Sequence, residues 1–473
     1  MNKYFNGNNQ VGVIIVFEVV VIFVFSLVMM AILGNSAIQY RVLRSASSKE
    51  QAFHIAEAGI NYYQWHLAHY PVDFMDGTGA APTSQADFGV DCYPHTYVDK
   101  DTNQTLGKYC LQITPPIVGS TIVTIKSIGY SSSNPSIKRT ITTRYGVPSF
   151  AKYAFLTNSD VWVGSTESVT GEMHANGGIH FDGTGNAPIT SAKNTYTCQT
   201  YHGCSPAQTK AGVWGSAPQA TKNFWNYPVP NVDFSSLTSD FASLKSSAQT
   251  GGIYLSPSNT QGYSLVFNSN STVSVYKVTS LSAHATGYDV NGNAHPEDLN
   301  YNARTLQFTQ VLPENGVIYI EDRTWVEGTV SARVMVAAAK LPYNATTAPS
   351  IIIPNNLVYT VKDGSVSLGL VAQKDVLLSY SVPDDLEINA AMVAQNGSVQ
   401  NYYFAGNIKD TITIYGAIAS YGVWTWSWVN GSGQTTGGYR NTSTAYDSNL
   451  LYAPPPSFPL TSGGYQQITW VSD

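Results

Sequence analysis

Apolar residues gather near the start of the chain, where they follow a helical pattern. Between Val11 and Gly34 the one charged residue is Glu18, and at about 1.5 Å per residue such a helix spans the ~30 Å hydrocarbon layer of a membrane. Apolar and small residues continue at helical spacing to Ile60, and Pro71 follows. A cleaved secretory signal would end sooner. The pattern therefore predicts a transmembrane helix that continues outside the membrane to about residue 70.

After Pro71 the pattern changes to period-two alternation between turn residues. Strands are expected at Lys108–Ile113, Ser120–Tyr130 and Lys138–Tyr145. We predict that residues 71–147 form a small antiparallel sheet packed on the upper half of the long helix.

From residue 148 to residue 473 the chain consists of short apolar runs separated by turn residues. The run Leu370–Gln373 recurs as Met392–Gln395 after 22 residues, and Ala417–Ser420 follows, with Ile418 25 residues after Val393. A period in the low twenties is typical of a parallel β-helix, in which each coil buries its apolar face against its neighbours. A β-sandwich is the alternative. Small residues should stack in one interior file: Ala372, Ala394 and Ala419.

Composition and charge narrow the possible functions. Charged residues make up 11% of the chain, and 31 tyrosines accompany abundant glycine, a composition typical of polar, turn-rich β structure. The net charge is -6 and no basic stripe is visible, so we expect no nucleic-acid partner.

The four cysteines form two couples that are local in sequence, Cys92 with Cys110 and Cys198 with Cys204. Neither couple has the spacing of a zinc site, so disulfides are the preferred interpretation and four free buried thiols the alternative. Disulfides persist in an oxidising compartment, which predicts an extracytoplasmic body.

The beginning of the chain resembles the class III signal of type IV pilins. A short leader with Lys3 ends at Gly12, and a hydrophobic helix with Glu18 near its start follows. The resemblance implies that prepilin peptidase cuts between Gly12 and Val13 and that the helix packs into a fibre core. Pilins usually have Phe at the position of Val13 and their glutamate one residue earlier than Glu18, a turn of about 100° around the helix.

The segment Ala52–Ile60, which reads AFHIAEAGI, is similar to the A-F-x-A-A-E-A-G motif of PilX-type minor pilins. This resemblance adds Glu57 to Glu18 as a residue of helix assembly. The body, including residues 159–181, is similar to β-helical bacterial surface proteins of unknown function.

Candidate catalytic chemistry is sparse. Two carboxylate and imidazole pairs could approach a metal, but polar turns explain them as well. An acidic cluster after Pro383 could serve a polysaccharide lyase or hydrolase, although a turn would also use these residues. We expect no catalytic residue, metal or cofactor. The residues weighed are Glu172, His174, His180, Asp182, Asp384, Asp385 and Glu387.

Three indoles alternate at Trp424, Trp426 and Trp428, which would place them on one face of a strand. Such a row can stack on sugar rings, or it can cover the open end of a β-helix. We prefer the cover and keep ligand binding as the alternative.

The sequence thus predicts a mainly β protein with a leader (1–12), a transmembrane and pilin-like helix (13–70), a small β segment (71–147) and a β-helix-like body (148–473). We expect a non-enzymatic, surface-exposed subunit of a type IV pilus-like fibre, with membrane lipid, pilin subunits, prepilin peptidase and surface glycans as partners. The alternative is a stand-alone surface-anchored protein that binds or cleaves carbohydrate.

Both cysteine couples should be oxidised in protein isolated from its own cell envelope. Alkylation of denatured, unreduced protein followed by mass spectrometry should leave Cys92, Cys110, Cys198 and Cys204 unlabelled, and reduction should make all of them reactive. Labelling of all four without reduction would contradict the prediction.

Overall fold

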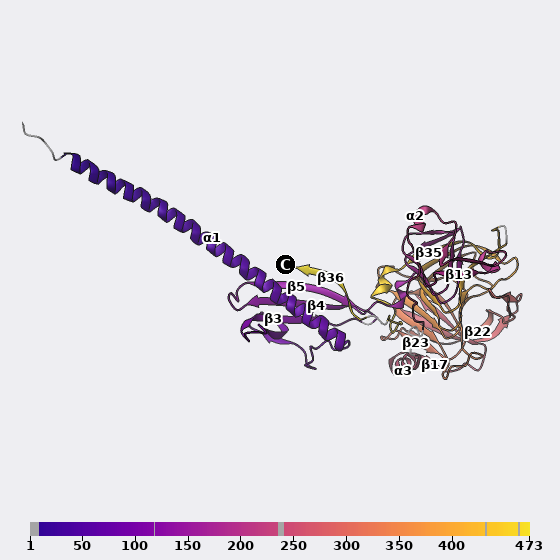
Figure 1. Ribbon diagram of the computed structural model, residues 1–473. Helices are drawn as coiled ribbons and strands as arrows, with labels where there is room; N and C mark the ends of the chain where they lie inside the picture. The colour runs from indigo at the N-terminus through magenta and orange to yellow at the C-terminus, as the bar shows by residue number, and fades with distance from the viewer. Residues whose placement is uncertain (1–8, 118, 235–240, 431–432, 462–463) are drawn as a thin grey trace, which may run out of the picture. The chain divides into compact units, whose positions relative to one another are not determined.

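The computed structural model describes residues 9–117, 119–234, 241–430, 433–461 and 464–473, without the side chains of residues 9–14 and 37. The chain folds into two compact units (Figure 1). The first comprises Met1–Pro115, Val123–Tyr145 and Gln467–Asp473, and the second comprises Pro116–Ile122 and Gly146–Gln466. The second unit is therefore inserted in the sequence of the first at two places, a short one at Pro116–Ile122 and a long one at Gly146–Gln466.

The first unit joins one long helix, α1 (Asn9–His69), to a six-stranded sheet. Neighbouring strands from β1 to β5 are antiparallel, and the C-terminal part of α1 packs mainly on β4 and β3. This confirms the predicted helix and the antiparallel segment beside it. The strand order is β1 (Thr83–Gln85), β2 (Val90–Val98), β3 (Thr105–Thr114), β4 (Val123–Ser131), β5 (Lys138–Gly146) and β36 (Gln466–Ser472).

The position of β36 corrects the predicted boundary of the body, because the predicted body extends to residue 473 whereas β36 lies in the sheet of the first unit. β36 is the neighbour of β5 in the first unit. The hydroxyl of Thr143 donates to the carbonyl of Thr469 at 2.7 Å, and the amide of Asp473 donates to the carbonyl of Thr140 at 3.1 Å. A short alternating pattern predicts a strand but not its partner, so this pairing over more than 300 residues was not visible in the sequence.

The second unit is a parallel β-helix with three ladders of strands. Ladder A runs through β17 (Ile253–Leu255), β23 (Val317–Ile320), β25 (Arg333–Ala338), β28 (Ser367–Ala372), β30 (Asp385–Ala394), β32 (Ile408–Ser420), β6 (Phe155–Thr157), β9 (Met173–Ala175), β12 (Ile189–Ser191) and β16 (Trp225–Asn226). Its strands pair in parallel, as in the predicted β-helix and unlike the sheets of the β-sandwich alternative.

The other two ladders complete the coils. Ladder B runs through β18 (Gly262–Asn268), β24 (Thr324–Val330), β26 (Ile351–Ile353), β29 (Val376–Leu378), β31 (Val399–Gln400) and β33 (Trp424–Thr425). Ladder C runs from the end of β24 through β27 (Leu357–Tyr359), the first halves of β30 and β32, β35 (Thr435–Tyr446), β8 (Glu167–Thr170) and β11 (Thr184–Gly185).

The order of coils in the stack differs from their order in the chain. The first strand of the body, β6, pairs with β32 on one side and with β9 on the other. The chain therefore enters the β-helix in the middle, builds outward to β16, crosses to the opposite end at β17 and returns to the middle at β32.

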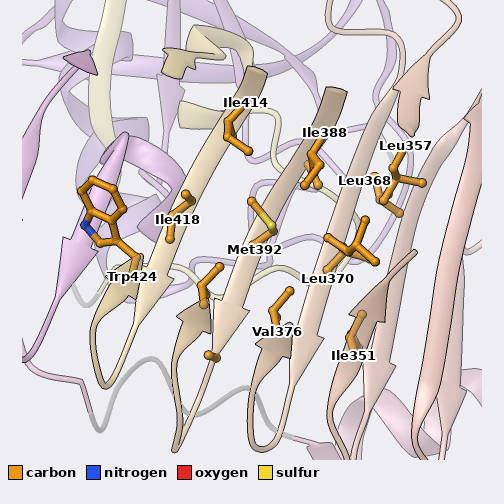
Figure 2. Packing of buried hydrophobic residues seen from close by; sticks show 14 of the residues in the cluster. Ile351, Leu357, Leu368, Leu370, Val376, Ile388, Met392, Ile414, Ile418 and Trp424 are labelled. Atoms are coloured by element: carbon orange, nitrogen blue, oxygen red, sulfur yellow. The ribbon is translucent and has the colours of Figure 1, made fainter. Parts of the chain in front are cut away.

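The interior contains aliphatic side chains in register from coil to coil. Leu370, Met392 and Ile418 occupy paired positions and point into the same core (Figure 2). The predicted file is wrong in its third member, because Ala394 pairs with Ser420 while Ala419 lies beside Val393 on the outer face. A shift of one residue turns a strand's side chains to the opposite face. The match of alanines in the sequence aligned Ala394 with Ala419, one residue before its true partner Ser420.

The outer face of ladder A is also apolar and buried. Val371, Val393 and Ala419 belong to a second cluster, to which the helix α3 (Phe241–Gly251) and the 3-10 turns η1 (Phe150–Lys152) and η3 (Ser448–Leu451) contribute. Strands buried on both faces read as continuous hydrophobic runs, which explains the sequence of Ladder A strands such as β25 and β28.

Removal of residues 466–473 should loosen the first unit and spare the β-helix. The truncation deletes the strand beside β5, so backbone amides of β5 should exchange hydrogen for deuterium much faster. Mass-spectrometric hydrogen exchange checks this, and β30 in the body is the internal control that should not change. Unchanged exchange in β5, or equal acceleration in β30, would contradict the assignment of β36.

Candidate functional sites

The N-terminal part of α1 presents apolar side chains to every side. Phe17 is 69% exposed and Leu43 is 68% exposed, with similar values between them. Ile15–His69 is long and apolar enough to cross a membrane, judged by length and composition. Glu18 lies in this segment and is exposed. The leader residues 1–8 lie outside the described residues, as do the side chains at the expected cleavage site, Gly12 and Val13.

The C-terminal part of α1 carries the pilin-like motif, and its small residues lie against the sheet. Ala52, Ala56 and Ile60 are fully buried. A Cβ atom added to Gly129 on β4 would come within 2.4 Å of the backbone nitrogen of Ala56, and one added to Gly59 would come within 2.4 Å of the Ser127 hydroxyl. The alanines and glycines of the motif therefore permit close approach of helix and sheet.

Glu57, the other expected assembly residue, lies away from this contact. Its carboxylate is 3.2 Å from Nδ1 of His54, and the side chain is 39% exposed. It thus remains accessible to a partner helix. Glu18 and Glu57 have no described contact with each other, and their role in assembly stays a prediction.

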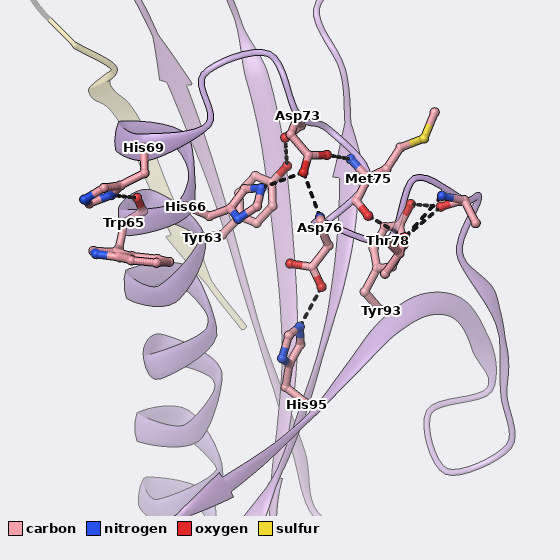
Figure 3. A network of polar contacts seen from close by, with 12 residues as sticks. Tyr63, Trp65, His66, His69, Asp73, Met75, Asp76, Thr78, Tyr93 and His95 are labelled. Atoms are coloured by element: carbon pink, nitrogen blue, oxygen red, sulfur yellow. Dashed lines mark hydrogen bonds and ion pairs between the residues drawn. The ribbon is translucent and has the colours of Figure 1, made fainter.

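A polar network fixes the chain just after α1 (Figure 3). The Asp73 carboxylate accepts hydrogen bonds from the amides of Met75 and Gly77, both at 2.8 Å, and lies 3.2 Å from His66 Nε2. The hydroxyl of Tyr63 donates to the carbonyl of Asp73 at 2.9 Å. The Met75 amide, with Gly77 and His66, lowers the pKa of Asp73. This turn is a structural support, and the sequence offered no signal for it beyond Pro71.

Both cysteine couples are joined as expected. Cys92 bonds to Cys110 between β2 and β3, and Cys198 bonds to Cys204 across a short loop. The second disulfide frames the 3-10 turn η2 (Thr200–His202).

The tryptophan row does not form an exposed face. Trp424 is 5% exposed and Trp426 is 1% exposed, both inside the main core, where Trp424 stacks on Phe155 with 4.1 Å between ring centroids. Trp428 is half-buried and donates from Nε1 to the carbonyl of Asn401 at 3.0 Å. Trp424 and Trp426 are thus core residues, and they lie at mid-stack instead of covering an end, because β6 continues the stack beyond β32.

The candidate metal ligands are separated by burial and by other partners. His174 is buried and lies 3.0 Å from Asn176 Oδ1, whereas Glu172 is exposed. His180 lies 3.0 Å from Asp182. Among the described residues no group of three or more His, Cys, Asp or Glu is arranged to hold a metal ion.

The acidic cluster weighed for a polysaccharide lyase or hydrolase lies at the surface. Asp384 is 3.2 Å from Lys409 and Glu387 is 2.9 Å from Lys362, while Asp385 is exposed. Asp384 and Glu387 are thus paired with lysines, and these pairs explain two of the three charges in the cluster.

A charged cleft of about 500 Å³ lies on the outer side of ladder B. Its carboxylates are already engaged, because Glu321 pairs with Lys245 and Asp322 accepts from the amide and hydroxyl of Ser258. These carboxylates in the wall of the cleft therefore stabilise the fold through contacts within the protein.

A second cleft, lined by aromatic side chains, was also not predicted from the sequence. It has a volume of about 200 Å³, and aromatic residues from distant parts of the sequence line it: Trp162, Tyr201, Trp424 and Trp428. Trp162 is the end of a row of stacked rings. Its ring centroid lies 5.0 Å from that of His180, and the His180 centroid lies 3.9 Å from that of Trp214. The rings of Trp162, His180 and Trp214 meet because their strands pair: β7 (Val161–Val163), β10 (Ile179–Phe181) and β15 (Val213–Trp214). Spacing in the sequence does not reveal this pairing, so the stacked row was not predictable.

The fold thus defines a long apolar N-terminal helix, an antiparallel sheet and an inserted parallel β-helix. No family model matches the chain, and no curated protein sequence matches it. Among solved structures the chain is similar to the competence-associated pilin ComZ from Thermus thermophilus, with 13% identity, a TM-score of 0.28 and coverage of 90% of this chain and 97% of that chain. A likeness at this TM-score shows neither a shared fold nor a shared function.

Substitution of Gly129 by Ala should destabilise the first unit by about 1–3 kcal/mol, as overpacking of a close contact does, because the new methyl group meets the backbone of α1. Thermal and denaturant unfolding of the full chain in detergent measure the change. The matched control is Gly34→Ala, since a Cβ atom there meets nothing within 4 Å; it should be neutral or stabilising by about 0.5–1 kcal/mol. Equal behaviour of the two variants would contradict the close-approach argument.

Proposed function

We propose that this protein is a membrane-anchored, pilin-like subunit that is processed by prepilin peptidase, enters a type IV pilus-like fibre and displays its β-helical body at the cell surface. One observation carries the proposal. α1 is divided into a C-terminal part that packs on the sheet and an N-terminal part whose apolar side chains are exposed on all sides.

The exposed part of α1 needs an apolar environment. A helix that is hydrophobic all round is stable in lipid or among other helices, and not in water. A fibre subunit meets both environments in turn, lipid before assembly and neighbouring helices after it. The motif in Ala52–Ile60 and the leader that ends at Gly12 favour a pilin-like subunit over a simple anchor.

Glu18 supports the fibre over a permanent membrane location. A lone carboxylate in a membrane is costly and favours a partner. Cleavage after Gly12 would create an amine at Val13, near enough in sequence for the corresponding amine of a neighbouring subunit to pair with Glu18. The body would then be carried outward for adhesion or assembly.

The alternative function is a stand-alone surface-anchored protein that binds or cleaves carbohydrate without entering a fibre. The exposed anchor fits it equally, and the aromatic cleft favours binding over cleavage. What separates the alternatives is processing of the leader.

Protein from the native cell envelope should begin at Val13. N-terminal mass spectrometry measures this, and Gly12→Leu should retain Met1 and keep the protein in the membrane fraction, because the residue before the cut is changed. The matched control is Gly7→Leu in the same leader, which should be processed normally and should appear in sheared surface fibres. Mature surface protein with an intact Met1 would exclude the pilin-like proposal and favour the stand-alone anchor.

A further inference from the structure

The aromatic cleft lies at a seam in the β-helix. Where the last coil meets the first, β32 pairs with β6 in ladder A and β35 pairs with β8 in ladder C. In ladder B the corresponding strands, β33 and β7, belong to different sheets, and no pairing joins them among the described residues. Both strands line the cleft, which thus occupies the one side of the seam where ladder pairing is interrupted.

The walls of the cleft supply flat rings held in fixed positions. Trp162 is half-buried, stacks on His180 and donates from Nε1 to Asp182 at 3.0 Å. Trp428, on the strand β34 (Ser427–Val429), is fixed by its bond to the Asn401 carbonyl. The half-exposed indoles therefore keep their orientation without a ligand, which lowers the entropy lost on binding.

The third wall is the short loop closed by the disulfide between Cys198 and Cys204. It carries Tyr201, which is 54% exposed, and His202, which is 7% exposed. The disulfide restricts the loop, so this wall is also formed before any ligand arrives.

Two buried polar atoms in the lining residues lack partners. Nδ1 of His202 and Nε1 of Trp424 have no hydrogen-bond partner among the described residues, although both side chains are more than nine-tenths buried. Such unpartnered groups are uncommon in folded proteins and require an explanation. Both atoms lie beneath the lining surface, so the ligand contacts would be the indole faces of Trp162 and Trp428 and the ring of Tyr201.

Charge and size select the class of ligand. None of the described residues that line the cleft is lysine or arginine, and burial lowers the pKa of His202, which keeps the imidazole neutral near pH 7. A phosphate backbone would find no cation here. A cleft of about 200 Å³ is smaller than a typical pocket for a drug-sized molecule, so it suits a single ring.

We propose that this cleft binds one neutral pyranose ring of a glycan, with Trp162 and Trp428 as stacking faces and Tyr201 at its mouth. The apolar face of a sugar ring would lie on an indole. The inference gives the displayed body a ligand class, and it rests on the proposed function only for the location of the body at the surface.

Binding is measured on the full chain in detergent by ligand-observed NMR. The probes are methyl glucoside, methyl galactoside, methyl mannoside and N-acetylglucosamine, with adenosine monophosphate as the nucleotide arm. At least one sugar should bind saturably by roughly 10 mM. Trp428→Ala and Tyr201→Ala should each weaken that binding by about tenfold, as expected for the loss of one ring contact.

Matched controls separate the cleft from general effects. Trp65→Ala and Tyr343→Ala remove rings that are 53% and 51% exposed outside the cleft, and both should bind like the unaltered chain. Tyr201→Ala changes an exposed side chain and should fold normally, which a thermal midpoint verifies. Absence of saturable sugar binding, equal binding by Tyr201→Ala and Tyr343→Ala, or binding of the nucleotide alone would overturn the proposal. Leader processing is measured separately, so either proposal can fail without the other.

Discussion

The body depends on one constraint: a coil of a parallel β-helix buries its apolar side chains only against the coils beside it. Both ends of the stack therefore need cover. At one end the chain supplies β19 (Thr272–Ser282) and β22 (Asn300–Val311), which extend β18 as antiparallel strands and bring Val273 and Val275 into the core. At the other end Trp225 and Tyr227 pack against the core. Internal segments cover the ends, so both termini of the body are free to emerge at mid-stack.

This arrangement explains how the body can be inserted between β5 and β36. The amide of Thr461 donates to the carbonyl of Pro148 at 2.9 Å, and the amide of Ser149 donates to the carbonyl of Leu451 at 3.0 Å. Entry and exit of the body are thus hydrogen-bonded neighbours. Adjacent termini allow a domain to be inserted without disturbing its host, and the sheet of the first unit needs its last strand to return from this exit.

Local patterns predicted the parts of the fold that local forces determine. The long helix follows from its periodicity, and the β-helix follows from near-repeats such as Leu370–Gln373 and Met392–Gln395. Periodicity does not specify contacts between distant segments. Three features depend on such contacts: the partner of β36, the pairing of β6 with β32 and the true register of Ala419. The indoles Trp424 and Trp426 are buried, as a cover requires, but they lie at mid-stack, because β6 pairs with β32 and continues the stack beyond them.

The aromatic cleft shows the same dependence on assembly of the stack. A regular β-helix continues every ladder from coil to coil, and the aromatic cleft lies where one ladder is interrupted. Here the first and last coils meet through two ladders, while on the third no pairing joins β7 to β33 among the described residues. Because strand β7 carries Trp162 and the chain after β33 carries Trp428, the interruption places both indoles in the wall of the cleft. The entry of the chain at mid-stack therefore permits insertion of the body and also creates the aromatic cleft.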